Sequence, residues 1–246
     1  MASTLRGSQL TEAHRLLQAR LSKNTVDQLR VDWELVDPLR VDATMEGWLR
    51  AALATIDRQR KVSATIAARY QQQFRIAEIG KAIDLPTPTP LPLEAATTSL
   101  IVQGPVRYRA LLAAGRSSTE ASTMASATSA VAGTRHVLNG GRDLLMEASD
   151  ADPLALGSRR VCSAGCCAFC AMLAASWVDG ASGDNFQAHD NCHCQPESSY
   201  EEGAQHATRQ AKEFHALYHE STSGVGGGGS NKLNAFRQAL AAQRRA

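Results

Sequence analysis

All six cysteines of the chain lie between residues 162 and 194, although the chain has 246 residues. Cys167 and Cys170 form a C-x2-C pair, and eighteen residues later an H-x2-C-x-C group supplies His189, Cys192 and Cys194. Structural zinc sites take four cysteine or histidine ligands in a tetrahedral arrangement. Two cysteines separated by two residues can reach one ion from a single turn, and a distant second pair can complete the tetrahedron. The segment therefore predicts a Zn²⁺ site of the Cys3His type.

Five residues of this pattern compete for four positions around one ion. We expect Cys167, Cys170 and His189 to be ligands, because they include the closely spaced pair and the histidine that begins the second group. One of Cys192 and Cys194 completes the set, and the spacing does not distinguish them.

A short helix is expected to begin near Cys170, because the apolar residues that surround it share one helical face: Phe169, Met172, Leu173 and Trp177. Cys170 then lies in the first turn, where the helix dipole favours a thiolate. The remaining cysteines, Cys162 and Cys166, are either buried small hydrophobic residues or alternative ligands. His193 points away from the site if this piece of the chain is extended.

A disulfide-linked loop is the alternative to a metal site. The N-terminal sequence "MASTLRGSQLTEAHRLL" lacks the continuous apolar core of a signal peptide, and no run approaches the length of a membrane span. We therefore expect the protein to fold in a reducing cytoplasm, where clustered cysteines indicate metal binding more often than disulfides. The formal net charge of +2 gives no indication of a nucleic-acid or polyanion partner.

The first 85 residues predict an arm of elongated helices. Apolar residues recur at helical spacing at Leu10, Ala13, Leu17 and Leu21. Ser8 is a candidate N-cap for this helix. Asn24 is a candidate N-cap for a second, short helix, which should end before Pro38 because proline disfavours helix at the preceding residue.

A longer helical pattern runs from Met45 to Phe74 and beyond. If it is continuous over about 38 residues, the helix is roughly 57 Å long. A helix of that length outgrows a compact domain and indicates an arm or hairpin lying along a partner. The alternative is a pair of ordinary helices broken near residues 58–61.

Residues 86–93 predict a stiff, extended connector, because four of the eight prolines fall within "PTPTPLP". We place a domain boundary here, with a helical domain at 94–222 that contains the zinc motif at 160–197. In this domain "SSTEASTMASATSAVAGTRHVL" either lets helices approach closely or forms only weak helix. "NGGRDLL" predicts a turn before another short helix.

Residues 223–231 predict a flexible, glycine-rich linker, and residues 232–246 predict an amphipathic helix. Leu233, Phe236 and Leu240 share one face of this helix, which is either a docking element or a frayed terminus. Aromatic residues make up only 5% of the chain, which favours helices with small-residue contacts. The expected fold is mainly α, with elongated N-terminal helices and a small zinc-stapled, loop-rich C-terminal region.

Sequence motifs of known enzymes are absent. The chain has no G-x-S-x-G, S-x-x-K or H-E-x-x-H, and it lacks the H-x-E of cytidine deaminases. A cysteine protease would need Cys162 or Cys166 near a histidine such as His136 or His206, and the spacing does not favour this. A serine–histidine arrangement forms only in the folded chain. The catalytic residues, if there are any, stay unknown at this level.

The stretches "RRVCSAGCCAFCAMLAASW" and "FQAHDNCHCQPE" are similar to the MuF-like minor capsid proteins of actinobacterial tailed phages, which are named after protein F of phage Mu. The shared elements are Arg160-Val161, the C-x2-C at the start of a helix and the downstream H-x2-C-x-C. "VLNGGRDLL" also resembles the approach to this motif, so the resemblance covers roughly residues 100–197. The chain departs from the pattern at "SWVDGASGDNF", where family members often carry R-G-x-x-Y.

The resemblance implies a minor capsid, head morphogenesis protein with structural Zn²⁺, present in few copies in the virion, inside the capsid and near the portal. Its implied partners are the portal protein and the major capsid or scaffold protein, with no membrane. Packaged DNA is a further possible contact, at the arginine-rich tail. Relatives are often described as capsid maturation proteases, so cleavage of scaffold or capsid protein is the alternative function. The residues themselves favour a structural role without enzymatic activity.

Overall fold

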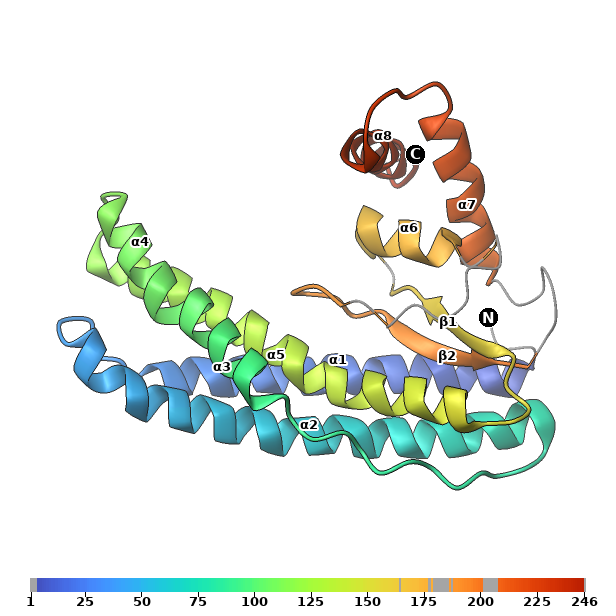
Figure 1. Ribbon diagram of the computed structural model, residues 1–246, viewed down its shortest axis with the longest axis horizontal. Coiled ribbons are helices and arrows are strands. Elements are labelled where there is room, and N and C mark those ends of the chain that lie inside the picture. Colours follow the sequence, from blue (N-terminus) through green and yellow to red (C-terminus); the bar gives the residue numbers. More distant parts are fainter. Residues whose placement is uncertain are drawn as a thin grey trace.

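Three long helices set the shape of the molecule in the computed structural model, which describes residues 4–163, 165–176, 178, 186, 188–200 and 208–245 (Figure 1). They pack side by side as an elongated bundle formed by α1 (Leu5–Trp33), α2 (Val41–Ile79) and α5 (Ser118–Ala151). A smaller region with a two-stranded sheet and three short helices lies beside one end of the bundle (Figure 1). The expected mainly α fold is confirmed.

Helix α1 is one continuous helix. Thr4 is its N-cap and accepts a hydrogen bond from the backbone N–H of Gly7, so the expected cap at Ser8 is wrong. The expected break at Asn24 is also wrong, because Thr25 is fully buried and packing against the bundle continues through this turn. The helix ends before Pro38, as predicted.

Helix α2 is also continuous over 39 residues, about 58 Å at the usual rise of an α-helix. The alternative break near residues 58–61 does not occur. Arg60 is buried there, donates a 2.9 Å hydrogen bond to the carbonyl of His136 and forms an ion pair with Asp143 of α5. Arg60, a polar residue within the apolar pattern, thus holds α2 and α5 together. Helix α2 lies along α1 and α5 of its own chain.

Helix α5 contains the small-residue stretch and the "NGG" sequence. The expected turn at "NGGRDLL" is wrong, because Gly140 and Gly141 lie inside the helix. A Cβ atom on Gly140 would lie 2.5 Å from Cγ and 2.7 Å from the carbonyl oxygen of Arg60. The glycine therefore serves close helix approach rather than a turn. The close-packing interpretation of this stretch is confirmed.

The proline-rich segment leaves the end of α2 at Gly80, whose φ of 76° lies in the left-handed region. Residues 81–92 form no helix or strand and run along the bundle to a second helical stretch (Figure 1). This stretch consists of α3 (Leu93–Ile101), the π-helical η1 (Val102–Val106) and α4 (Arg107–Ala113). Leu100 packs into the same core as Trp48 and Ala125. One core thus receives residues from both sides of the connector.

The smaller region begins with two antiparallel strands, β1 (Gly157–Val161) and β2 (Gln195–Ser199). A buried ion pair joins the strands, because Arg159 donates to Glu197 at 3.0 and 2.7 Å. The same carboxylate accepts hydrogen bonds from Tyr70 of α2 at 3.2 Å and from Thr11 of α1. The sheet is therefore attached to the bundle through a buried polar network.

Three helices complete this region: α6 (Ala168–Ser176), α7 (Arg209–Thr222) and α8 (Gly229–Gln243). The last begins inside the glycine-rich stretch, earlier than residue 232. Phe236 and Leu240 are buried and Leu233 is partly buried, in a cluster shared with α6 and α7. The amphipathic face therefore docks on its own chain. Of the helices described, none is long and apolar enough to cross a membrane.

Candidate metal centre

Strand pairing brings the two parts of the cysteine segment together. In the sheet Val161 is opposite Gln195, so the residues that follow β1 and precede β2 meet at one end of the ladder. Cys162 follows β1 directly and Cys194 precedes β2 directly. Helix α6 packs against β1 and carries the C-x2-C pair to the same place. All six thiols are free, and five of them are buried; Cys167 is exposed.

The first group of donor atoms consists of Cys167, Cys170 and His189. Nε2 of His189 lies 2.9 Å from Sγ of Cys167 and 3.3 Å from Sγ of Cys170. Cys170 lies in the first turn of α6, as predicted, and its backbone N–H donates to Sγ of Cys167 at 3.4 Å. The structure thus brings together the three residues that the sequence favoured most.

The ring of His189 is oriented by its own loop. Nδ1 lies 2.6 Å from the carbonyl oxygen of Asp190 and must donate to it, since a carbonyl only accepts. In the neutral ring Nε2 then presents its lone pair to the sulfurs, as a metal ligand requires. Asn191 adopts a φ of 63°, and the backbone N–H of Cys192 closes the turn on the carbonyl of His189 at 3.1 Å. Asp190 is ion-paired with Arg135 of α5 at 2.8 Å, which attaches the loop to the bundle.

Cys192 and Cys194 both reach the cluster. Sγ of Cys192 lies 3.6 Å from Sγ of Cys170, and a second group of donor atoms within 4.8 Å of one another comprises Cys170, Cys192 and Cys194. His193, between them, is exposed and belongs to none of the donor groups found among the described residues. Its side chain therefore lies apart from the cluster.

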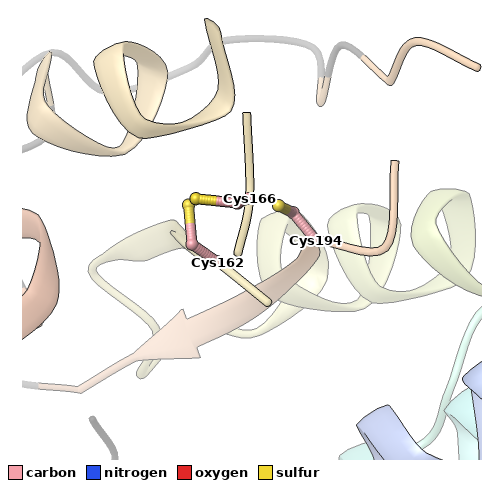
Figure 2. Close-up of side chains that lie close together, drawn as sticks. All are labelled: Cys162, Cys166 and Cys194. Atoms are coloured by element: carbon pink, nitrogen blue, oxygen red, sulfur yellow. The ribbon is translucent and has the colours of Figure 1, made fainter. Parts of the chain in front are cut away.

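A third group contains Cys162, Cys166 and Cys194, whose sulfurs also lie within 4.8 Å of one another and face one another in Figure 2. Gly165, with a φ of 76°, and a 3.0 Å hydrogen bond from Cys166 N–H to the carbonyl of Ser163 form the turn between the first two. Sequence reasoning treated Cys162 and Cys166 as extras. The C-x3-C spacing was a signal, but their partner Cys194 is brought near only by the pairing of β1 with β2.

The thiols of the cluster shift one another's pKa values strongly. Neighbouring thiols donate hydrogen bonds to Sγ of Cys194 and lower its pKa, whereas thiol hydrogen bonds and burial raise the pKa of Cys162 and Cys170. The hydrogen bond with Cys170 lowers the pKa of Cys192, but the hydrogen bond with Cys194 and burial outweigh it, so that pKa is raised. The thiols of the cluster are therefore coupled, and the proton affinity of each depends on its neighbours. A bound cation would instead stabilise several thiolates together.

Three arginines surround this cluster. Arg142 of α5 is buried and donates to the carbonyl of Cys194 at 3.1 Å and to that of Cys192. Burial lowers its pKa. Arg160 of β1 lies 3.9 Å from Sγ of Cys170, and Arg244, just after α8, lies 3.9 Å from Sγ of Cys166. Positive charge therefore faces the sulfurs from three different elements.

These sulfur and imidazole donors are the ligands that zinc prefers, and the donor groups contain no carboxylate. The cluster can therefore hold a metal ion of soft or borderline character. The sulfurs and the imidazole converge on one another within the fold, and the group that contains Cys167 lies nearest the surface because that thiol is exposed.

Other histidines considered from the sequence do not form a catalytic pair with a cysteine among the described residues. His136 is buried in α5, its Nε2 has no hydrogen-bond partner, and burial lowers its pKa to about 4. His215 and His219 lie next to each other on α7, with ring centroids 4.2 Å apart and the ring planes tilted by 55°. Trp177 and His206, which the sequence analysis also named, lie outside the described residues.

Comparison with known proteins gives one match. The profile of a family described as VG15 protein matches residues 7–221. No curated protein and no solved structure matches the chain. The matched range begins in α1 and ends in α7, so it includes the bundle except for the first two residues of α1, and every donor residue of the candidate metal centre.

Proposed function

The chain belongs to the VG15 protein family, a family of viral and phage proteins, and from this membership we propose that it is a minor capsid protein of a tailed phage that acts in head morphogenesis. It is of the MuF-like type, and it lies inside the capsid near the portal. Zinc has a structural role in it. The resemblance of the cysteine–histidine segment to MuF-like proteins supports this finer assignment.

The observation that carries the structural role is the convergence of the donor atoms. Cys167 directly precedes α6, Cys170 lies in its first turn, and His189 comes from the distant loop before β2. Cys192 is the fourth ligand because its sulfur lies 3.6 Å from that of Cys170. The cluster that α6, α7 and α8 bury is built largely from the small side chains of alanine and cysteine. A metal ion that joins these segments contributes folding free energy that such small side chains supply only weakly.

The end of the bundle away from the metal centre is the proposed contact surface for the portal or for the major capsid or scaffold protein. This end is formed by the turn between α1 and α2 and by the end of α4 (Figure 1). It exposes apolar side chains, including Leu39 at 90% and Leu35 at 53%. Exposed leucines on an elongated arm are typical of a surface that a partner covers.

One contact favours the alternative function, capsid maturation proteolysis. Cys167 is exposed, precedes the first turn of α6 and lies 2.9 Å from Nε2 of His189, which is the geometry of a cysteine nucleophile beside its base. The same nitrogen lies 3.3 Å from Sγ of Cys170. A second thiol at the base has no role in a catalytic pair, whereas a metal ion requires it, so we place zinc binding first.

Two variants separate these functions. Purified protein, Cys167→Ser and Cys192→Ser are compared for zinc by elemental analysis and for cleavage of scaffold and capsid protein, with and without a chelator. The structural role predicts that both variants lose zinc and that no form cleaves either protein. Cleavage that requires Cys167, but neither Cys192 nor metal, would replace this proposal with a cysteine protease.

The place in the head is tested on particles. Virions from a phage that encodes this chain are analysed by mass spectrometry, and crosslinking identifies the neighbours of the exposed bundle end. We expect a low copy number and crosslinks from the α1–α2 turn to portal or capsid protein. Absence from both mature virions and assembly intermediates would contradict a minor capsid role.

A further inference from the structure

The donor atoms of the cluster are more numerous than one zinc ion can use. One tetrahedral ion takes four ligands. Seven residues of the segment contribute to the three overlapping donor groups: Cys162, Cys166, Cys167, Cys170, His189, Cys192 and Cys194. After the four ligands of the proposed site, Cys162, Cys166 and Cys194 remain, and these three form a donor group of their own (Figure 2).

We propose that the chain binds two zinc ions in one thiolate cluster, in which Cys162, Cys166 and Cys194 hold the second ion and one thiolate is shared by both ions. This inference rests on the zinc site proposed above and adds a second position to it. Seven donors fill the eight positions of two tetrahedral ions when one sulfur bridges them.

The middle donor group supplies the bridge. Cys170 belongs to the group of His189, Cys194 belongs to the group of Cys162, and both belong to the group that includes Cys192. A sulfur of this middle group thus lies near both ion positions. Thiolate sulfur has the lone pairs to bind two ions, and imidazole nitrogen does not, so the shared ligand is a cysteine.

Charge is a second argument for the second ion, besides the distances between donor atoms. Six thiolates carry six negative charges and two Zn²⁺ ions carry four positive charges, so two negative charges remain. Arg160 and Arg244 place guanidinium nitrogens 3.9 Å from Sγ of Cys170 and Sγ of Cys166, which are ligands of different ions. Each half of the cluster therefore has its own cation, as buried charge requires.

The second ion also explains how the C-terminal helix is held. Arg244 donates a 2.6 Å hydrogen bond to the carbonyl of Cys166, and Phe236 of α8 is fully buried in the cluster of apolar residues around the cysteines. An ion at Cys166 fixes the turn on which α8 docks. Among the described residues, His189 of the first site makes no hydrogen bond to α8.

The test measures zinc per chain in the full-length protein, purified without chelator. Two equivalents support the cluster. One equivalent overturns the second site and leaves the single structural zinc intact, whereas none overturns both proposals. Iron with acid-labile sulfide, or a disulfide between Cys162 and Cys166 found by alkylation of the denatured protein, would also overturn it.

Variants locate the ions. The double substitution Cys162→Ser/Cys166→Ser should lower zinc from two equivalents to one, and His193→Ala is the matched control because that side chain lies between two ligands but outside the cluster. The control should keep two equivalents. Loss of zinc from the control, or two equivalents in the double variant, contradicts the assignment.

Cadmium substitution in the wild-type chain keeps the proposal testable if the double variant does not fold. The ¹¹³Cd NMR spectrum of the protein with two cadmium ions should show two resonances with scalar coupling through the shared sulfur. Two uncoupled resonances would overturn the bridge, and a single resonance would overturn the second site.

Discussion

At the scale of single residues, the candidate centre depends on side chains that bind no metal themselves. Arg142 holds the carbonyls of Cys192 and Cys194 in place, and the carbonyl of Asp190 orients the ring of His189. Such supporting contacts decide whether ligands converge before an ion arrives. They also explain why the spacing of the cysteines alone does not specify the site.

Substituting Arg142 tests this support. Arg142→Gln removes the donors to two ligand carbonyls, so we expect zinc affinity to fall by roughly 10–100-fold, the usual effect of losing an outer contact of a metal ligand. Competition with a colorimetric chelator measures this change. Arg237→Gln, at an exposed position of α8, is the control, and an equal loss there would show that the effect is not specific to the cluster.

His14 predicts a pH dependence of stability. Burial lowers its pKa to about 3, and the ring stacks on Tyr70. The unfolded chain binds a proton near pH 6.5 and the folded chain resists it, so this contribution is complete above pH 6.5 and is lost as pH falls toward 3. The slope of unfolding free energy should be flatter in His14→Gln by up to about 1.4 kcal/mol per pH unit.

Urea unfolding between pH 7 and pH 4.5 measures the slope for wild type and variant under identical metal conditions, so that acid release of zinc affects both. His219→Gln, at an exposed position of α7, is the control and should keep the wild-type slope. Identical slopes in the wild type and His14→Gln would contradict the buried, uncharged state of His14.

At the scale of elements, close approach of α2 and α5 depends on the absence of side chains. Gly140 meets the backbone of Arg60, and the buried guanidinium of Arg60 then reaches the carbonyl of His136 and the carboxylate of Asp143. The glycine and the arginine therefore act together at the same helix contact. The glycine permits the distance, and the arginine satisfies the polar groups at the contact.

Two glycine substitutions should change the free energy of unfolding in opposite directions. Gly140→Ala places a Cβ against backbone, so we expect a loss of about 1–3 kcal/mol from overpacking despite the better helix propensity of alanine. Gly47→Ala lies in α2 with nothing within 4 Å of the new Cβ, so we expect a gain of up to about 1 kcal/mol. Urea unfolding measures both, and a stabilised Gly140→Ala would refute the close contact.

At the scale of the whole molecule, the bundle core and the core around α6, α7 and α8 are stabilised in different ways. The bundle core collects large apolar side chains such as Leu29, Trp48 and Ile56, whereas the core around α6, α7 and α8 is built largely from alanines and cysteines with Phe214 and Phe236. Area removed from water stabilises the first. Under the proposed function, the second also depends on the zinc ion that its sulfurs bind.

Chelation should therefore unfold the molecule in part. After zinc removal under reducing conditions, we expect rapid amide hydrogen exchange in α6 and α8 while α1, α2 and α5 stay protected. Hydrogen exchange with mass spectrometry measures this difference, and circular dichroism should retain most of the helical signal. Simultaneous loss of protection in the bundle would mean that the two cores unfold as one unit.

The spacing of residues in short stretches was sufficient to predict the features that depend on neighbours in the chain. Periodic apolar residues predicted helix along α2 and left open a break near residues 58–61. The C-x2-C and H-x2-C spacings predicted that Cys167, Cys170 and His189 would converge. Turn and helix geometry act over a few residues, so their signals are written in short stretches. The expected turn at Gly140 failed because a glycine has the same local signature in a turn and in a close helix contact.

Only the tertiary structure decided how the remaining cysteines are used. Cys162 and Cys166 meet Cys194 because Val161 pairs with Gln195, and no local spacing records the register between two strands that are separated in the chain by residues 162–194. The chain itself thus indicated that long helices exist and that one segment carries residues with metal-ligand spacing. Strand register and helix packing decided which sulfurs share a cluster, because those contacts depend on residues far apart in sequence.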